Sequence, residues 1–463
     1  MRRVALVVLA ACSGDEPPKT TPLWSDGTHL RDAEGRVALL RGINARVEGV
    51  FDVTFADGRT PLEPIPPLTH ADCTRMRELG FDLLRLPINW SGIEPSRGSY
   101  DESYLQRVDA AIDCAGDAGL YVIVDLHQDA YSKEIGEDGA PLWAIEPPPE
   151  QLLQGPLTDL GARRVSPQVQ AAFRTFFATD DASGLQAAFA DMLTHVAARW
   201  ARHPAVIGFE LFNEPDTGSA ELDAFHAHTA EAVRAAAPDK LVFFEPPALR
   251  NFTDFIPKPM RPFATSGAVY SPHIYTFVFY PDQTRFQTAT PDQLEPSVQA
   301  ARDEATAWKT PLFIGEFGVG PNDDAQHALW MHTQAQLHAR YFASNAFWLW
   351  KEQSQGSWGL FAYDATTATW TERPHVIAWV SRVHVARIAG TPVSLEASVD
   401  GSAITLELAP GSASEAPHLI YIPERYASST QISCDGAAVA AQRDPATGLV
   451  AIVCRGVLEV GPG

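Results

Sequence analysis

The sequence predicts an α/β fold, a (β/α)8 TIM barrel followed by a small C-terminal β-sandwich, on three observations. Eight short β-branched or aromatic runs alternate with helical stretches between residues 37 and 352, which is typical of a parallel sheet. No GxGxxG or phosphate-binding loop follows the first run, and this disfavours the commonest open-sheet alternative. From about residue 391 the pattern changes to short alternating strands.

The eight barrel strands are expected at VALLRGIN (37–44), FDLLRLPIN (81–89), YVIVDLH (121–127), VIGFELFNEP (206–215), LVFFEP (241–246), AVYSPHIY (268–275), PLFIGEFG (311–318) and NAFWLWKE (345–352). Helices are expected between most of them, for example over 70–80 and 102–119. Nearly every run begins apolar and ends polar. Because the active sites of such barrels lie at the carboxyl ends of the strands, we expect these polar ends to converge on one face.

The connection over residues 128–205 is long and proline-rich, and we expect it to build part of a substrate wall. Residues 372–390 are expected to form the helix that closes the barrel. The β-sandwich is predicted by five alternating runs, TPVSLEASVD, SAITLELAP, HLIYIPERY, TQISCDGA and GLVAIVCRGVLEV. We therefore expect a catalytic domain of residues 23–390 and a sandwich domain of residues 391–463.

The charge of the chain excludes two classes of partner. The 463 residues include 35 basic and 57 acidic side chains, a formal charge of −22. Nucleic acid is excluded because its phosphates need a basic surface, and docking on anionic lipid through a polybasic patch is excluded for the same reason. The hydrophobic content of 45% is enough for a sizeable core.

The N-terminus, residues 1–22, has the features of an export signal and a tether. Arg2 and Arg3 precede the apolar run VALVVLAA, which ends at Cys12 and is too short to span a membrane. The sequence LAAC ending at Cys12 also resembles a bacterial lipoprotein box, in which the cysteine is lipidated. We expect an exported protein, either secreted or held at the bacterial cell surface or outer membrane through a lipidated Cys12.

Four further cysteines could form disulfides, which an exported protein permits. Cys434 and Cys454 flank a predicted hairpin and are expected to pair. Cys73 and Cys114 lie on successive predicted helices, where they either pair or remain two buried free thiols. No CxxC or Cys/His spacing indicates zinc, and we expect no metal and no cofactor.

Two glutamates end apolar strands on opposite sides of the predicted barrel. Glu214 closes the fourth strand in FNEP, and Glu316 closes the seventh in IGEFG. Facing carboxylates are what glycosidic cleavage needs, since one must donate a proton while the other attacks the sugar. We expect the apolar strand and the second carboxylate to keep Glu214 partly protonated.

The polar strand ends resemble those of glycoside hydrolase family 5. The resemblance rests on Arg85, His127, Asn213-Glu214-Pro215, His273 with Tyr275, Glu316 and Trp348, and it covers residues 37 to about 390. It implies a retaining hydrolase in which Glu214 is the acid/base and Glu316 is the nucleophile. Arg85 is expected to place its cation beside Glu316, and Tyr275 is expected to donate its hydroxyl to the same carboxylate. Asn213, His127 and Asp129 are expected to bind sugar hydroxyls, and His273 to contact the sugar or to support the residues that do. Trp348 is expected to form the floor on which a sugar ring stacks.

Further stretches resemble the endoglycoceramidase branch, whose members cleave between the glycan and the ceramide of glycosphingolipids. They are DLHQDAYS (125–132) with GEDGAPLWA (136–144), RPH (373–375) and ARIAGTPVS (386–394). After the first strand those enzymes usually carry a sugar-contacting lysine, whereas this chain offers Arg46 or Glu48. The partner implied is a glycan or glycolipid, bound by a monomer.

Several alternatives stay open at this point. The substrate is either a glycolipid or a non-lipid β-glucan, and a non-catalytic carbohydrate-binding lipoprotein is a third hypothesis. Residues 51–55, 141–149 and 275–281 follow catalytic-face strand ends, and they form an apolar slot for acyl chains, pack the long loops or stack on further sugar rings. Glu210 is expected to pair with an inward arginine or another polar group and not to act on substrate, and Glu245 is expected to brace the site.

Overall fold

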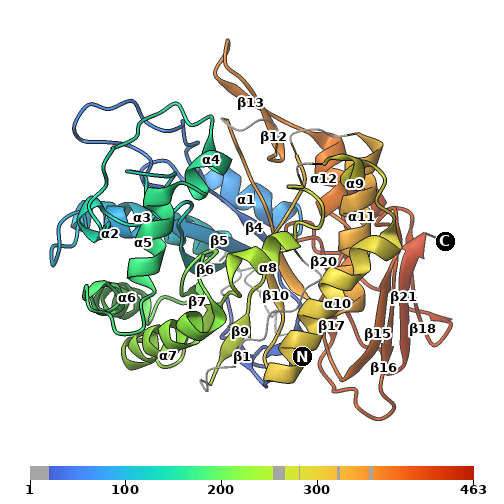
Figure 1. The fold of residues 1–463 in the computed structure, drawn as a ribbon. Coiled ribbons are helices and arrows are strands. Elements are labelled where there is room, and N and C mark those ends of the chain that lie inside the picture. Colours follow the sequence, from blue (N-terminus) through green and yellow to red (C-terminus); the bar gives the residue numbers. More distant parts are fainter. Residues whose placement is uncertain (1–19, 254–265, 281, 321–323, 354–357, 463) are drawn as a thin grey trace, which may run out of the picture.

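The computed structural model describes residues 20–253, 266–280, 282–320, 324–353 and 358–462. Its centre is the predicted barrel of eight parallel strands (Figure 1), hydrogen-bonded in the order β10-β11-β4-β5-β6-β7-β8-β9. The strands are β4 (Arg41–Asn44), β5 (Leu83–Ile88), β6 (Tyr121–Leu126), β7 (Val206–Glu210), β8 (Leu241–Phe244), β9 (Ala268–Tyr270), β10 (Phe313–Phe317) and β11 (Ser344–Phe347). The predicted fold class is confirmed, and each strand lies within or next to its predicted run.

The barrel closes between β9 and β10 through parallel bridges that pair Tyr270 with Leu312 and Ile274 with Phe317. The Ile274 N–H donates to the Glu316 carbonyl over 2.9 Å. Closure therefore brings the segment after β9 beside the end of β10. All six residues of β5 and of β6 are buried, as expected for strands covered on both faces.

Helices surround this sheet. They are α1 (His70–Glu78), α2 (Trp90–Ile93), α3 (Glu102–Asp117), α4 (Leu160–Arg164), α5 (Pro167–Phe176), α6 (Leu185–Trp200), α7 (Ser219–Ala236), α8 (Ala248–Thr253), α9 (Thr284–Gln287), α10 (Pro291–Trp308), α11 (Ala325–Arg340) and α12 (Pro374–Val380), with short 3-10 turns at Leu142–Ala144 and Glu424–Tyr426. Helix α1 starts at a capping box formed by Thr69 and Asp72, and the Asp101 side chain caps α3, so both begin where the sequence supplies acceptors for the first N–H groups. Within the described residues no helix is long and apolar enough to cross a bilayer.

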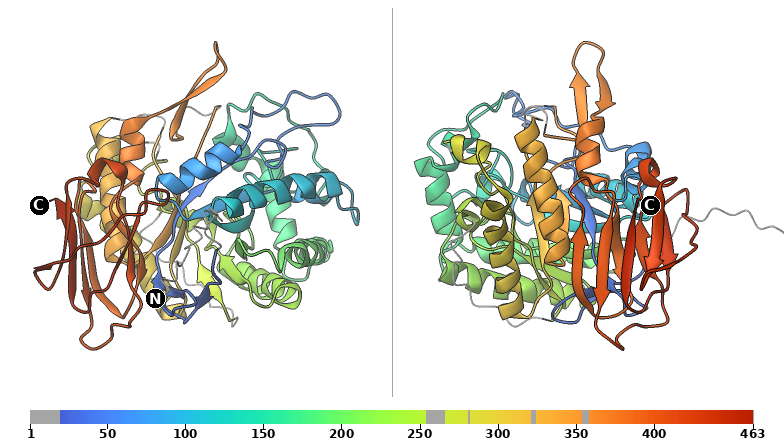
Figure 2. Two further views of the ribbon diagram at one scale, coloured as in Figure 1. Left: turned by 180° about the vertical axis from the view of Figure 1, so that it is seen from behind. Right: turned by 90° about the vertical axis from the view of Figure 1, so that its right-hand side faces the viewer.

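The β-sandwich lies beside α11 and α12 and takes strands from both ends of the chain (Figure 2). One sheet has the order β1-β2-β3-β14-β17-β20 and the other has the order β15-β16-β21-β18-β19. Their bounds are β1 (Trp24–Ser25), β2 (Leu30–Arg31), β3 (Val37–Ala38), β14 (His384–Ile388), β15 (Pro392–Ala397), β16 (Ile404–Leu408), β17 (His418–Tyr421), β18 (Thr430–Cys434), β19 (Ala437–Ala438), β20 (Leu449–Ile452) and β21 (Val457–Pro462).

Two boundaries differ from those expected. Residues 372–390 do not form one closing helix, because α12 ends at Val380 and β14 follows it. The side chains of Val385 and Ile388 pack into the sandwich core, and this burial holds the segment as a strand. Strands β1–β3 also join the sandwich, so the sandwich extends beyond residues 391–463.

Both pairs of cysteines considered from the sequence are disulfides in the structure. Cys73–Cys114 joins α1 to α3, and Cys434–Cys454 joins the strand β18 of one sandwich sheet to the segment after β20 of the other. A cross-link of this kind stabilises a fold mainly by restricting the unfolded chain. The expected export signal and Cys12 lie outside the described residues.

The hairpin of β12 (Phe361–Asp364) and β13 (Thr369–Glu372) follows β11 and projects from the molecule on the side where α4 lies (Figure 1). Helix α4 belongs to the long connection after β6. Both features therefore stand on loops that leave the carboxyl ends of barrel strands, the end at which a site is expected.

Candidate active site

A pocket of about 650 Å³, including space open to solvent, lies at the carboxyl ends of the strands. Seven of the predicted site residues line it, namely His127, Asp129, Asn213, Glu214, Tyr275, Glu316 and Trp348. Arg85 and His273 are fully buried and lie beneath them. The barrel thus brings together side chains that are up to 221 residues apart, between His127 and Trp348.

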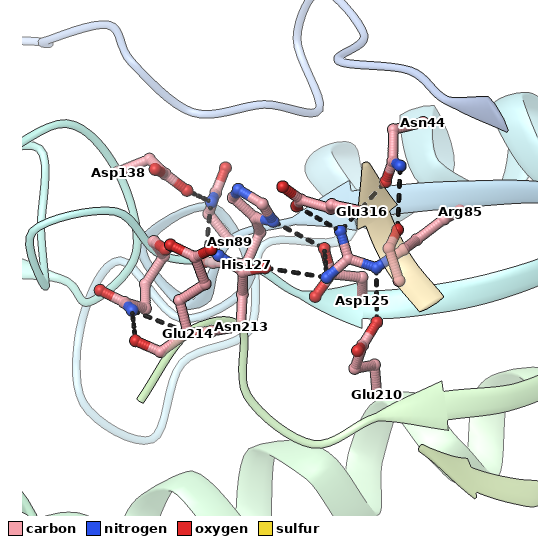
Figure 3. Close-up of polar contacts among 12 residues, drawn as sticks. Asn44, Arg85, Asn89, Asp125, His127, Asp138, Glu210, Asn213, Glu214 and Glu316 are labelled. Carbon is pink, nitrogen blue, oxygen red and sulfur yellow. Dashed lines mark hydrogen bonds and ion pairs between the residues drawn. The ribbon is translucent and has the colours of Figure 1, made fainter. Parts of the chain in front are cut away.

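Arg85 on β5 is the electrostatic centre of the site (Figure 3). Its Nη1 donates to Glu316 Oε1 over 2.8 Å, and its Nε donates to Glu210 Oε2 over 2.5 Å. Its Nη2 donates to Asn213 Oδ1 over 2.8 Å and lies 3.1 Å from Asp125 Oδ2. Burial opposes the charge, but these carboxylates outweigh it and hold the pKa of Arg85 well above its usual value. The guanidinium therefore remains a fixed cation.

Glu316 is held at both carboxylate oxygens. Arg85 donates to Oε1, and the Tyr275 hydroxyl donates to Oε2 over 2.8 Å. Both contacts were expected from the sequence. Two donors on the two oxygens of one side chain fix its rotamer. Glu316 is consequently an oriented carboxylate on the wall of the pocket.

Glu214 lies in a turn rather than on β7, which ends at Glu210. Its φ of 43° is in the left-handed region, which costs a non-glycine residue of order 1–3 kcal/mol. The side-chain Nε2 of Gln128 donates to the carbonyls of Asn213 and Glu214 over 2.7 and 3.0 Å. Gln128 therefore holds the strained turn that presents Glu214 to the pocket.

His273 connects the two glutamates from below. Its Nδ1 lies 2.8 Å from Glu214 Oε1 and 3.5 Å from Glu316 Oε2, and its Nε2 lies 3.2 Å from Glu245 Oε1. Burial opposes protonation, but the surrounding carboxylates raise the pKa of His273 well above its usual value. The imidazolium thus forms a hydrogen bond with Glu214 and an ion pair with Glu245.

The expectation that Glu214 is partly protonated in the free site is wrong. Burial alone would raise its pKa, but the hydrogen bond and the charge of His273 lower the pKa of Glu214 to about 2. The apolar residues of β7 suggested a desolvated acid, and the sequence could not reveal that a histidine 59 residues later lies against it. The shared proton therefore rests on the imidazole.

Glu210 and Glu245 brace the site as expected. Glu210 pairs with Arg85 and accepts from the Ser271 hydroxyl over 2.6 Å. Burial raises the pKa of Glu245 to about 8, an effect that the neighbouring His273 opposes. Neither residue lines the pocket.

His127 and Asp129 occupy the wall formed after β6. His127 Nδ1 lies 2.6 Å from Asp125 Oδ2, and this carboxylate, against the effect of burial, raises the pKa of His127 to about 9. The imidazole ring stacks on Trp348, with ring centroids 5.7 Å apart. Asp129 forms two hydrogen bonds with Arg164, one of them over 2.7 Å, so its carboxylate is already paired.

Five pocket residues lie outside the predicted site residues, Arg46 and the candidate apolar slot, namely Glu137, Leu160, Arg164, Glu352 and Trp358. Arg164 lies on α4 and Trp358 lies between β11 and β12, so neither stands at the carboxyl end of a barrel strand. Glu352 does end the predicted eighth run, in which Trp348 is the predicted site residue and Lys351 is the neighbouring polar residue. Lys351 pairs with Asp72 over 2.5 Å.

The apolar slot takes a smaller form than the one considered from the sequence. Phe51, Tyr275 and Phe279 line the pocket, and no residue of 141–149 does so. The Trp143 ring packs against Trp90, with ring centroids 5.1 Å apart, which is the loop-packing alternative. The Phe279 ring stacks on Trp358 at 5.6 Å and leaves about half of Phe279 exposed.

Two groups of potential metal ligands occur in the part of the chain that the structure describes. They are Glu210, Glu245 and His273, and Glu214, His273 and Glu316. Both groups surround the cationic His273, and Glu210 and Glu316 also accept from Arg85. Protein cations thus already compensate these carboxylates.

Removing Arg85 should destabilise the fold. The substitution Arg85→Met leaves Glu210, Asp125 and Glu316 without their cation, and breaking a buried ion pair typically costs about 3–5 kcal/mol. We expect a loss of this size in the free energy of unfolding, measured by chemical denaturation at pH 7. Arg75→Met is the control, because Arg75 pairs with Glu372 at a partly exposed position and should cost no more than about 1 kcal/mol. Equal losses for both variants would contradict the account.

A barrel with two oriented glutamates, a buried arginine and a tryptophan at its mouth is the scaffold of a glycoside hydrolase. Residues 51–354 match the family model described as cellulase (glycosyl hydrolase family 5). The chain therefore belongs to glycosyl hydrolase family 5.

Similar proteins include enzymes named endoglycoceramidase and endogalactoceramidase. The chain is 26% identical to endoglycoceramidase I of Rhodococcus hoagii (strain 103S), over 94% of this chain and 86% of that protein. The crystal structure of endogalactoceramidase superposes with a TM-score of 0.79 at 25% identity, over 96% of this chain and 100% of that one. Endo-glycoceramidase II from Rhodococcus sp., captured as a lactosyl-enzyme intermediate, shares the fold with a TM-score of 0.75 at 24% identity, over 94% of this chain and 100% of that one.

Proposed function

We propose that this protein is a retaining β-glycosidase that cleaves glycosphingolipids between the glycan and the ceramide. Glu316 is the nucleophile and Glu214 is the acid/base. The observation that carries the proposal is the placement of both carboxylates on one pocket, with Glu316 held by Arg85 and Tyr275. The similarity to endoglycoceramidase I over 94% of the chain supports the substrate class.

The separation of the two glutamates supports retention of configuration. One carboxylate oxygen of Glu214 and one of Glu316 lie within 4.8 Å of each other. Retaining enzymes hold the two carboxyl groups about 5–5.5 Å apart, whereas inverting enzymes leave about 6.5–9.5 Å for a water molecule. Such a close approach favours direct attack by Glu316 on the sugar.

In the first step, a carboxylate oxygen of Glu316 attacks the anomeric carbon, and the bond from that carbon to the ceramide oxygen breaks. The proton on His273 Nδ1 passes to Glu214 through their 2.8 Å contact, and Glu214 passes it on to the leaving oxygen, which leaves His273 neutral. Asn213 is already oriented by Arg85 and by the Gln128 carbonyl, so it can contact the sugar 2-hydroxyl, a hydrogen bond that strengthens in the transition state.

In the second step, Glu214 acts as the base. It removes a proton from a water molecule, the water oxygen attacks the anomeric carbon, and the bond to Glu316 breaks. Two inversions give net retention. His273 then takes up the proton again through its 2.8 Å contact with Glu214.

The proton on His273 should set the basic limit of activity. The pKa of His273 is raised, so its proton is present at neutral pH and is lost only as the pH rises through that raised value. In His273→Gln the proton must rest on Glu214, a carboxyl that titrates at lower pH. We expect the basic limb of the kcat/KM profile to move to lower pH. An unchanged limb would show that His273 does not supply the proton.

A β-glucanase is the second candidate, because the matching family model is described as cellulase. The pocket wall favours a lipid, since Leu160 and Phe279 lie beside the catalytic residues. The two candidates are separated by incubating the protein with lactosylceramide, glucosylceramide and a soluble β-glucan, with Glu316→Gln as a blank. Release of intact glycan from the lipids supports the proposal, and cleavage of the glucan alone overturns it.

We further propose that the protein is exported and anchored through Cys12. The two disulfides support an oxidising compartment, and the apolar run before Cys12 supports export. Mass spectrometry of the mature protein should find a lipidated Cys12 at its N-terminus. An intact Met1 on the cell-associated protein would refute this.

A further inference from the structure

One end of the pocket contains a buried charge cluster that neither chemical step uses. Arg46 follows β4, and its Nη1 donates to Glu63 Oε1 over 2.5 Å and to Glu137 Oε1 over 3.3 Å. Its Nη2 donates to Glu352 Oε1 over 2.6 Å. All four residues are at least nine-tenths buried. Three carboxylates therefore surround one guanidinium, and three of these four residues, Arg46, Glu137 and Glu352, line the pocket.

Two polar atoms of this cluster have no hydrogen-bond partner among the described residues. They are Nε of Arg46 and Oε2 of Glu352. A buried donor or acceptor left unpaired costs about 1–3 kcal/mol, and more when the group is charged. A sugar hydroxyl both donates and accepts, so hydroxyls of a bound glycan are suited to pair with an N–H group and a carboxylate oxygen. Both partners come from residues on the pocket wall.

The cluster lies on the side of the nucleophile. Arg46 and Glu352 follow β4 and β11, which pair with each other, and β11 pairs with β10, the strand that carries Glu316. The Arg46 guanidinium lies 6.0 Å from the ring of Trp348. Glu214 belongs to the turn after β7, on the opposite side of the barrel. Because Glu214 must face the leaving group, the Arg46–Glu352 end faces the glycan.

We propose that Glu352, held in place by Arg46, is a specificity-determining residue that binds a hydroxyl of the glycan through its free carboxylate oxygen. The inference rests on the proposed function and adds which part of the substrate Glu352 binds. An uncharged sugar ring fits this end of the pocket, since the cation of the cluster is already paired with Glu63 and Glu352.

The charge state of the cluster is compatible with this role. Burial raises the pKa of Glu352 to about 7, an effect that Arg46 opposes. Burial and neighbouring acids also raise the pKa of Glu137 well above its usual value. Above its pKa of about 7, Glu352 is a carboxylate, and its free oxygen accepts from a hydroxyl.

The test uses the full protein and activated aryl β-lactosides, comparing the parent lactoside with analogues that each lack one hydroxyl. Glu352→Gln keeps the size of the side chain but replaces the free carboxylate oxygen. A hydrogen bond to a charged group corresponds to roughly tenfold to a hundredfold in kcat/KM. We expect Glu352→Gln to lower kcat/KM for the parent lactoside by about that factor, mainly through KM. For the deoxy analogue that lacks the hydroxyl bound by Glu352, the variant and the wild type should have equal kcat/KM.

Glu63→Gln is the matched control. Glu63 accepts a hydrogen bond from the same Arg46 but does not line the pocket. Glu63→Gln should therefore lower kcat/KM by a similar factor on every analogue, and no deoxy analogue should abolish the difference between this variant and the wild type. If Glu352→Gln behaves in this uniform way, Glu352 is only a structural partner and the inference is wrong. If Glu352→Gln unfolds, Glu352→Asp carries the same comparison, judged by the same criterion. Failure of the wild type to cleave any lactoside would instead refute the proposed function.

Discussion

Replacing Glu316 with glutamine is expected to lower kcat by roughly 10⁴-fold or more, the range seen when a covalent nucleophile is removed. The amide can still accept from Arg85 and still contact the Tyr275 hydroxyl, so the fold should be preserved. It has no negative charge with which to attack the anomeric carbon. Hydrolysis of an aryl β-lactoside, measured beside the thermal unfolding temperature, checks this expectation.

The smaller variant Glu316→Gly provides the control for this role. It leaves a space beside the anomeric carbon, and azide can attack from the side on which Glu316 would have acted. We expect azide to restore turnover and to give the α-glycosyl azide, since only one inversion takes place. Full activity of Glu316→Gln in the absence of azide would mean that another group is the nucleophile.

Replacing Glu214 with alanine is expected to affect substrates according to their leaving groups. General acid catalysis contributes roughly 10²–10⁴-fold, so kcat/KM for a glycosphingolipid should fall by about that factor. A dinitrophenyl glycoside needs no proton on its leaving oxygen, and its kcat/KM should remain within about tenfold of the wild-type value. Steady-state kinetics on both substrates gives the comparison.

The second step supplies an independent readout for Glu214. Without the base, the glycosyl-enzyme on Glu316 should accumulate and kcat should fall even for the dinitrophenyl substrate. Azide needs no base, so it should restore kcat and give the β-glycosyl azide. Equal losses on both substrates, without a response to azide, would contradict the role of Glu214.

Most of the barrel could be predicted because its signals are local. Each strand is a short apolar run, and each ends where the polar residues begin. The N-terminal part of the sandwich could not be predicted, because VALLRGIN is one continuous run that divides between β3 and β4 in two different sheets. The strand β14 was hidden for a similar reason, since its burial depends on pairing with β3 and β17.

The residues of the site were accessible from the sequence to different degrees. Glu214, Glu316 and Arg85 end or lie within apolar strands, where charged side chains stand out. Arg164 and Glu137 belong to the long connection after β6, and no periodic pattern indicates where that connection folds back over the pocket. The proton on His273 follows from three-dimensional distances alone, because the carboxylates that raise its pKa come from three other strand ends.

Cleavage of lactosylceramide in water enriched in ¹⁸O tests the central claim most directly. The account predicts an intact disaccharide that carries one ¹⁸O at its reducing end, released first as the β-anomer, together with unlabelled ceramide. Mass spectrometry identifies the labelled product, and proton NMR at early times reports the anomer. Release of galactose alone, release of a free fatty acid, label in the ceramide hydroxyl or a first-formed α-anomer would each contradict the account.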